Sequence, residues 1–324
     1  MQLQSANRVR TGFVMTLLIC AVMVRFFLSW DAAGEQPQEV QPKPQTVVSL
    51  RPVLSAPEPL PIMAEEPSDT PVSVPQLPVF DARDAAGIRV AGMSTYRPDV
   101  QAALSSPWQA CADAAPTVLL VHTHGTESYT AEAGWEYDGA EGLRTTQAEY
   151  SVVRVGRELK AVLERHGITV LHDETMHDEQ SFALAYTASR TAVEGYLQAH
   201  PEVDLVIDLH RDAAENPDGS AFAPTVTVEG QAYARLMLVV GTDEGGLHHP
   251  DWQKNFRCAA QLQALLNRSL PGLCRDMDLR TERFNQDLHP GMLLIEMGAA
   301  GNTMREVLRS AEVLADAVAE LLGK

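Results

Sequence analysis

The stretch VLLVHTHGTESY, residues 118–129, decides the fold prediction for this chain. Its apolar run ends abruptly in His122, His124 and Glu127. A short apolar run bounded by polar residues is typical of a strand that is buried on both faces. Histidine and carboxylate side chains at the end of such a strand are typical of zinc hydrolases. His124 and Glu127 are spaced H-x-x-E, so both can reach one ion from a single tight turn.

Two later apolar runs end in the same way. The run LVIDLH, residues 205–210, ends in His210, and the run MLLIE, residues 292–296, ends in Glu296. In an open α/β sheet, ligands bind beyond the carboxyl ends of the parallel strands. We therefore expect His124, His210 and Glu296 to lie at one edge of the sheet.

From about residue 116 onward, apolar runs alternate with amphipathic stretches. We expect strands at 118–121, 168–171, 205–209, 225–229, 236–240, 277–279 and 293–295, and helices at 151–166, 180–200, 252–270 and 303–322. Strands that alternate with helices predict an α/β fold: a single domain over residues 106–324 with a twisted, mostly parallel sheet flanked by helices. The sequence from Thr303 to Glu306 is a capping box that begins the last helix.

The N-terminal third of the chain predicts an anchor and a spacer. Residues 11–30 form an apolar run of about the ~20 residues that a membrane-spanning helix needs. Arginines precede this run and acidic residues follow it, so we expect residues 1–30 to be a cytoplasmic tip and anchor of a single-pass cell-membrane protein, with the C-terminal domain outside. A cleaved signal peptide is the alternative. Residues 31–105 contain eleven prolines between Pro37 and Pro78 and predict an extended extracytoplasmic linker; residues 85–114 could instead pack on the domain.

The overall composition limits the class of partner. The formal net charge is -18 and the chain has no Lys/Arg cluster, which argues against nucleic acid. The four cysteines form no CxxC pair, although a Cys258–Cys274 disulfide is conceivable.

The polar strand ends predict a zinc centre with His124, Glu127 and His210 as ligands. Two imidazoles and one carboxylate leave a fourth position for water, which zinc activates. Glu296 is the candidate that takes the proton from this water. Glu149 is the competing third ligand, and His122 is expected beside the ligands or at the substrate.

Each of these residues also has an ordinary explanation. A histidine at a strand end is usually a hydrogen-bonded core or surface residue, Glu127 could cap a turn, and Glu296 could pair with Arg211. Reactive residues at three equivalent strand ends are much less expected on these grounds. The motifs HExxH, GxSxG and the P-loop are absent.

Several motifs in order resemble the stage II sporulation protein P family. They are VHTHGTESY, HDETMHD, VIDLHRDA, VVGTDE followed by NF, and FNQDL with LLIEMGAAGNT, and they extend from about residue 116 to the C-terminus. The resemblance implies a zinc-dependent N-acetylmuramoyl-L-alanine amidase fold that acts on peptidoglycan during septal wall remodelling and engulfment. It also implies partners among sporulation membrane proteins and a lytic transglycosylase. By the resemblance, His124 and His210 match the metal histidines, Glu296 matches the catalytic glutamate, and Glu127 lies inside the first motif.

Two other functions remain open on the sequence. The order H-x-x-E, His, Glu also occurs in zinc carboxypeptidases, so the chain could act as a carboxypeptidase or endopeptidase on stem peptides. A non-catalytic module that binds the cell wall is the second alternative, although every candidate ligand is present.

Overall fold

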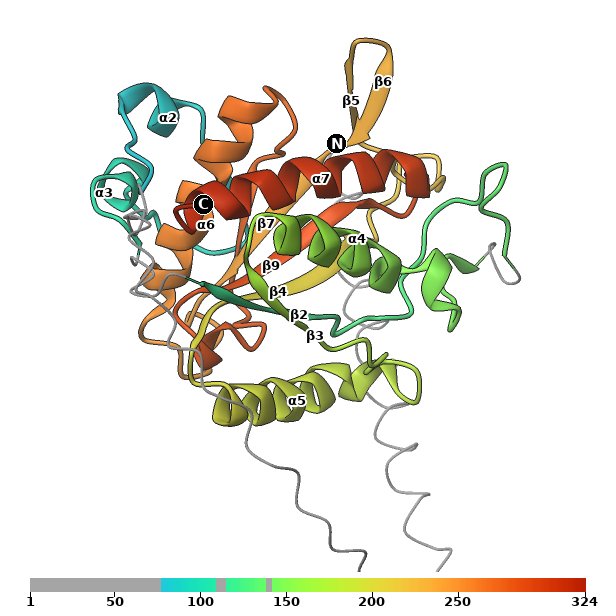
Figure 1. The fold of residues 1–324 in the computed structure, drawn as a ribbon, viewed down its shortest axis with the longest axis horizontal. Coiled ribbons are helices and arrows are strands. Elements are labelled where there is room, and N and C mark those ends of the chain that lie inside the picture. Colours follow the sequence, from blue (N-terminus) through green and yellow to red (C-terminus); the bar gives the residue numbers. More distant parts are fainter. Residues whose placement is uncertain (1–76, 109–114, 138–141) are drawn as a thin grey trace, which may run out of the picture. The chain divides into compact units, whose positions relative to one another are not determined.

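A computed structural model describes residues 77–108, 115–137 and 142–324 of the chain (Figure 1). Contacts divide the chain into two units, residues 1–69 and 70–324, and every described residue lies in the second unit. The expected anchor and most of the expected linker lie outside the described residues. In the described part of the chain, no helix has both the length and the apolar character needed to cross a membrane.

The second unit is built on a seven-stranded sheet with the strand order β1-β8-β7-β9-β4-β2-β3. Neighbouring strands are parallel except for β7 and β9, so the prediction of a mostly parallel α/β sheet is confirmed. Three strands run in one direction and four in the other. The seven strands are β1 (Val90–Gly92), β2 (Thr117–Val121), β3 (Thr169–His172), β4 (Val203–Asp212), β7 (Leu236–Gly241), β8 (Met277–Arg280) and β9 (Met292–Ala299).

Helices cover the two faces of the sheet unequally (Figure 1). Helices α4 (Val152–Arg165), α6 (Trp252–Ser269) and α7 (Met304–Leu321) pack on one face and form the main core with it. Helix α5 (Ala185–Ala199) lies on the other face, where Val193 packs against Val121 and Val206 in a smaller core. This second face therefore has a helix over β2 and β4.

The period-two alternation of β4 and β9 sends their polar residues to the α5 face. Leu209 and Ile295 belong to the main core, whereas His210 and Glu296 face the opposite way. The two strands are parallel neighbours, and His210 pairs in register with Glu296. The sequence predicted these two residues at one edge of the sheet, and the register places them side by side.

Local sequence signals explain where helices α4 and α7 begin. The Ser151 hydroxyl accepts a hydrogen bond from the backbone N–H of Val153 at the start of α4. The predicted capping box is present at the start of α7, where Thr303 and Glu306 satisfy each other's backbone N–H groups. These caps fix the ends of the helices that pack on each other and on the main core.

Residues 82–104, which the sequence prediction assigned to the end of the linker, form α2 (Ala82–Ala86), β1 and α3 (Val100–Leu104), and β1 pairs with β8. The sheet thus extends N-terminally of residue 106, although the domain boundary itself stays a prediction. The expected strand at 225–229 is part of a separate hairpin of β5 (Thr225–Val228) and β6 (Gln231–Ala234), which projects from the body of the unit (Figure 1).

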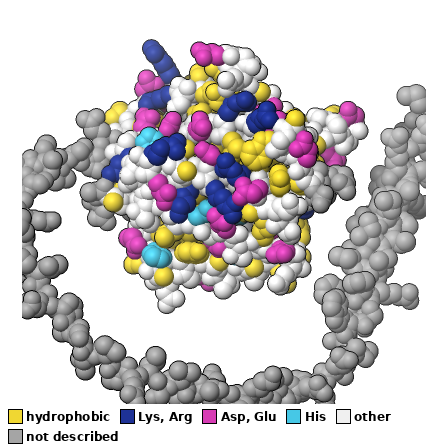
Figure 2. Space-filling model, turned by 45° about the vertical axis from the view of Figure 1, so that its right-hand side comes forward, with side chains coloured by type: hydrophobic (Ala, Val, Ile, Leu, Met, Phe, Trp, Pro, Cys, Tyr) yellow, Lys and Arg dark blue, Asp and Glu magenta, His cyan; other side chains and the backbone are white. Residues whose placement is uncertain are grey.

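Cys258 and Cys274 are free thiols, so the disulfide that the sequence left open is not present. Figure 2 shows basic and acidic side chains interleaved on one side of the molecule.

Candidate functional site

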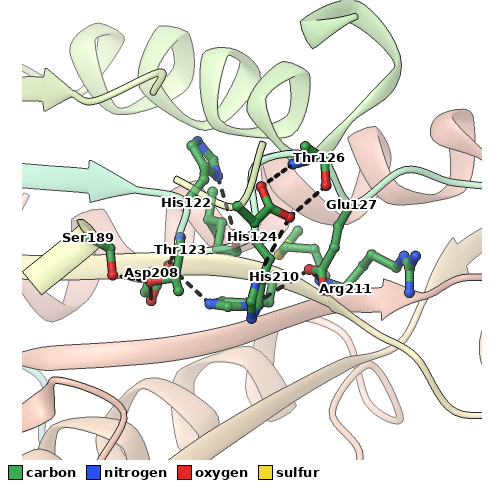
Figure 3. A network of polar contacts seen from close by, with 12 residues as sticks. His122, Thr123, His124, Thr126, Glu127, Ser189, Asp208, His210 and Arg211 are labelled. Carbon is green, nitrogen blue, oxygen red and sulfur yellow. Dashed lines mark hydrogen bonds and ion pairs between the residues drawn. The ribbon is translucent and has the colours of Figure 1, made fainter. Parts of the chain in front are cut away.

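The three predicted ligands come together beyond β2 and β4 (Figure 3). The backbone N–H of Glu127 donates to the carbonyl of His124 at 3.0 Å, which closes the expected turn. The His124 and His210 rings meet edge to face with centroids 5.4 Å apart. Glu127 Oε2 lies 3.6 Å from His210 Nδ1. All three side chains are buried, so the sequence correctly grouped residues that are far apart in the chain.

Carboxylates surround His210 on several sides. Asp208 Oδ1 lies 3.1 Å from His210 Nε2 and also accepts a hydrogen bond from the backbone N–H of Thr123 at 2.8 Å. Burial would lower the pKa of His210, but the charges of Asp208, Glu127 and Glu296 outweigh burial and raise that pKa to about 10. The carboxylates of Asp208 and Glu127 thus make the surroundings of His210 strongly negative.

Glu296 lies beside these residues with a pKa raised to about 8. Burial is the main cause, and the charges of Glu127 and Asp212 add to it, while His210 and Arg211 act in the opposite direction. Glu296 Oε2 is buried and has no hydrogen-bond partner. Arg211 instead donates to the backbone carbonyls of Ser128 and Leu143, so the structure does not contain the Glu296–Arg211 pair that the sequence left open.

The motif HDETMHD contributes a further carboxylate, Asp178, beside the site. Asp178 Oδ2 lies 3.7 Å from His124 Nδ1 and accepts hydrogen bonds from the Thr126 hydroxyl at 2.6 Å and from Arg144 at 2.7 Å. Burial would raise the pKa of Asp178, but His124 and Thr126 outweigh it and lower it to about 2. Phe182 then stacks on the His124 ring at 4.4 Å between centroids. The loop therefore packs against the site and is not simply solvated surface.

His122 lies apart from the three ligands. It points toward α4, away from the centre of the site (Figure 3). Its Nε2 lies 2.8 Å from His172 Nε2, and the pair packs against Gly156. Burial, together with the neighbouring His172, lowers the pKa of His122 to about 3. In the structure His122 thus contacts a second histidine.

Glu149, the competing third ligand, faces outward. Its side chain is 61% exposed and forms ion pairs with Arg154 and Arg157. Of the two candidate glutamates, Glu127 is the one that lies next to His210.

The fit to zinc can be judged from the polar atoms alone. Among the described residues, His124 Nδ1 is buried without a hydrogen-bond partner, and His210 Nδ1 faces Glu127 Oε2 at 3.6 Å, while its Nε2 faces Asp208. Two imidazoles and a carboxylate are the donors that catalytic zinc prefers. However, within residues 77–108, 115–137 and 142–324, no group of three or more His, Cys, Asp or Glu side chains already has an arrangement that could hold an ion. The donor chemistry fits zinc, and the zinc centre stays a prediction.

A cavity of about 560 Å³ opens beside the site. Glu296 and Tyr186 line it together with residues from the uncovered strands β1, β7 and β8. Tyr186 also stacks on the His210 ring at 6.3 Å between centroids. A molecule in this cavity would therefore contact Glu296.

Comparison with known proteins gives a family. The model of the family stage II sporulation protein P (SpoIIP) matches residues 75–319 of the chain. The chain belongs to this family. A curated SpoIIP relative, stage II sporulation protein P of Bacillus subtilis (strain 168), is 30% identical over 217 residues, which are 63% of this chain and 50% of the relative. The chain thus matches about half the length of that relative.

Solved structures that resemble this SpoIIP chain are much more distant. The N-acetylmuramoyl-L-alanine amidase AmiC2 of Nostoc punctiforme is 14% identical with a TM-score of 0.36, over 64% of this chain and 94% of that chain. The N-acetylmuramoyl-L-alanine amidase from Clostridium difficile 630 is 12% identical with a TM-score of 0.40, over 64% of this chain and 95% of that chain.

Two residues of the site were missed in the sequence of this SpoIIP member. Asp208 lies two residues before His210, so the period of a strand puts both on one face, and this signal could have found it. Asp178 approaches His124 from a loop more than fifty residues later in the chain. No local pattern could have predicted that contact.

Proposed function

We propose that this SpoIIP protein is a peptidoglycan hydrolase, a zinc-dependent N-acetylmuramoyl-L-alanine amidase that acts in septal wall remodelling during sporulation. The observation that carries the proposal is the meeting of His124, Glu127 and His210 beside Glu296, at the edge of an open cavity. Zinc held by the first three residues would polarise the amide carbonyl and make hydroxide available near neutral pH.

The protein's own residues supply the rest of the chemistry. Glu296 takes a proton from the attacking water and gives it to the leaving amine. Burial raises the pKa of Glu296 above the usual value of a carboxyl group, toward the range in which such a group can both accept and donate a proton. Asp208 holds His210 in position through its contact with Nε2, which leaves Nδ1 on the side of Glu127.

The decisive experiment measures products released from purified sacculi. The protein should release whole stem peptides from the glycan, and a chelator should stop the release. Glu296→Gln should retain zinc and lose turnover, whereas His210→Ala should lose zinc. Full activity of Glu296→Gln would contradict the assigned role of Glu296.

The products also separate this proposal from its alternatives. A carboxypeptidase would release a single terminal amino acid, an endopeptidase would cut within or between stem peptides, and a wall-binding module would pellet with sacculi without releasing product. We also propose that the protein is anchored to the cell membrane by residues 11–30, with its catalytic domain outside, and that it acts with sporulation membrane proteins and a lytic transglycosylase. Protease accessibility of the C-terminal domain in intact protoplasts tests the orientation.

A further inference from the structure

No helix of the described residues covers one half of the sheet face that carries Glu296. Helix α5 packs on β2 and β4, whereas the same face of β9, β7, β8 and β1 forms the floor of the cavity of about 560 Å³. The floor residues are mainly small or apolar and are Ala91, Met237, Val239, Asp278 and Leu294. Tyr186 and Phe284 form an aromatic wall, with ring centroids 5.8 Å apart. We call this cavity the open trough.

Four arginines line the open trough, and one of them differs from the others. Three are paired with carboxylates, in the pairs Arg89–Asp276, Arg275–Asp212 and Arg280–Asp278. Arg235 has no acidic partner within ion-pair distance in the described part of the chain.

The Arg235 guanidinium is held in a fixed orientation. Its Nε donates to the carbonyl of Gly272 at 2.8 Å, and its Nη2 donates to the carbonyl of Cys274 at 2.9 Å. A guanidinium has five N–H donors in a planar fork, so these two bonds occupy one edge and leave the edge between Nη1 and Nη2 free. A free, oriented guanidinium edge matches the two oxygens of a carboxylate.

The strand register places Arg235 close to the reacting centre. Met237 of β7 pairs with Glu296 of β9 in the antiparallel ladder. Arg235 precedes Met237 by two residues and lines the same cavity as Glu296, at a diagonal position of the ladder, where neighbouring residues are roughly 7–8 Å apart. An extended peptide advances about 3.3 Å per residue, so this separation corresponds to about two residues of a bound peptide.

We propose that the open trough binds the peptide part of the substrate in an extended form, and that Arg235 binds a free carboxylate about two residues from the cleaved amide. This inference rests on the proposed hydrolase function, because it takes the bond beside Glu296 as the one that is cleaved. The apolar floor suits an extended peptide, and the unpaired guanidinium supplies the complementary charge. Arg235 is a specificity-determining residue in this proposal and takes no part in bond cleavage.

The test compares two synthetic stem peptides. The first carries a free carboxylate on its second residue, and the second has a carboxamide at that position. Binding is measured with full-length Glu296→Gln protein, so that no peptide is consumed. The carboxylate peptide should bind about tenfold more tightly than the carboxamide peptide, as expected for one charge-assisted hydrogen-bonded pair. Adding Arg235→Gln should remove this preference, whereas Arg235→Lys should keep part of it.

Arg165→Gln is the matched control, because Arg165 is an exposed arginine at the end of α4, outside the trough. It removes the same charge and should leave the preference unchanged. In protein that keeps Glu296, Arg235→Gln should raise KM for the carboxylate substrate and leave kcat unchanged.

The outcomes separate the two proposals. If Arg235→Gln retains the preference for the carboxylate, or if no preference exists at all, the trough assignment is overturned, whatever the activity on sacculi. If the preference is present and depends on Arg235 but sacculi release no stem peptides, the hydrolase function fails and peptide binding in the trough stands. Equal unfolding midpoints of the Arg235 variants and the parent protein exclude a loss of binding through misfolding.

Discussion

Replacement of Asp208 tests the proposed metal centre most directly. Asp208 is fully buried, and its Oδ1 contacts both the Thr123 backbone N–H, at 2.8 Å, and His210 Nε2, at 3.1 Å. Its Oδ2 accepts a hydrogen bond from the Thr123 hydroxyl at 2.7 Å. In Asp208→Asn, the amide oxygen can replace Oδ1 and keep both contacts. The Thr123 hydroxyl already lies 2.8 Å from the Ser189 hydroxyl, so it can turn there and accept from the new amide group.

Asp208→Asn should therefore weaken zinc binding less than Asp208→Ala does. Asp208→Asn removes mainly the negative charge behind His210, and we expect zinc affinity to fall about tenfold, the lower end for such outer partners. Asp208→Ala also leaves the buried N–H of Thr123 without an acceptor. We expect its zinc affinity to fall about 100-fold and its free energy of unfolding to fall by about 1–3 kcal/mol.

Competition with a chromophoric chelator measures the zinc affinity, and urea unfolding of the metal-free protein measures stability. Asp204→Asn is the matched control on the same strand, because Asp204 lies at the start of β4, away from the site, where its Oδ2 accepts a hydrogen bond from the N–H of Thr117 in β2. It should leave zinc affinity unchanged. Wild-type affinity in both Asp208 variants would refute the assignment of His210 as a ligand supported by Asp208.

Three other changes test the surroundings of the site. Gly156→Ala should lower the free energy of unfolding by about 1–3 kcal/mol, because the new Cβ would lie 2.6 Å from His122 Nε2. Alanine in a helix is usually more stable than glycine, so a urea midpoint above that of wild type would contradict this packing. Glu127→Gln should weaken zinc binding in the chelator assay and Glu149→Gln should not; the opposite result would make Glu149 the ligand. Hydrogen bonds from His177 and Thr175 outweigh the effect of burial and lower the pKa of Asp173 to about 2. The ionised Asp173 carboxylate therefore stabilises the fold above about pH 4, and this stabilisation is lost as pH falls toward about 2. In acid unfolding curves, Asp173→Asn should lose less stability than wild type between these two pH values.

The sequence predicted those parts of the site that follow from the period of a strand. An apolar run that ends in His210 or Glu296 indicates a buried strand, and its last residue marks the carboxyl end of that strand. Parallel neighbours then bring such ends together without further information. For the same reason, the helix that begins at Thr303 could be predicted from its capping residues alone.

Contacts that depend on loop conformation and on pairing between distant strands could not be predicted in this way. Strand β1 has three residues, too few to show an alternating pattern, and only its pairing with β8 gives it a place in the sheet. His122 is two residues from His124, and strand geometry alone would put both on one side. The chain leaves the strand after Val121, and the two histidines separate.

The antiparallel pairing of β7 with β9 has the largest consequence for function. In a fully parallel sheet, the amino end of β7 would lie at the edge opposite the carboxyl end of β9. Because β7 runs the other way, its first residues lie beside Glu296, and Arg235 just before them faces the same trough. Two strand directions thus combine at one edge: β2, β4 and β9 bring the groups that we propose carry out hydrolysis, and β7 brings the group that we propose selects the peptide. A local sequence pattern predicts the first set, since each strand end carries its own reactive residue. The second follows only from strand direction, which is a property of the folded sheet.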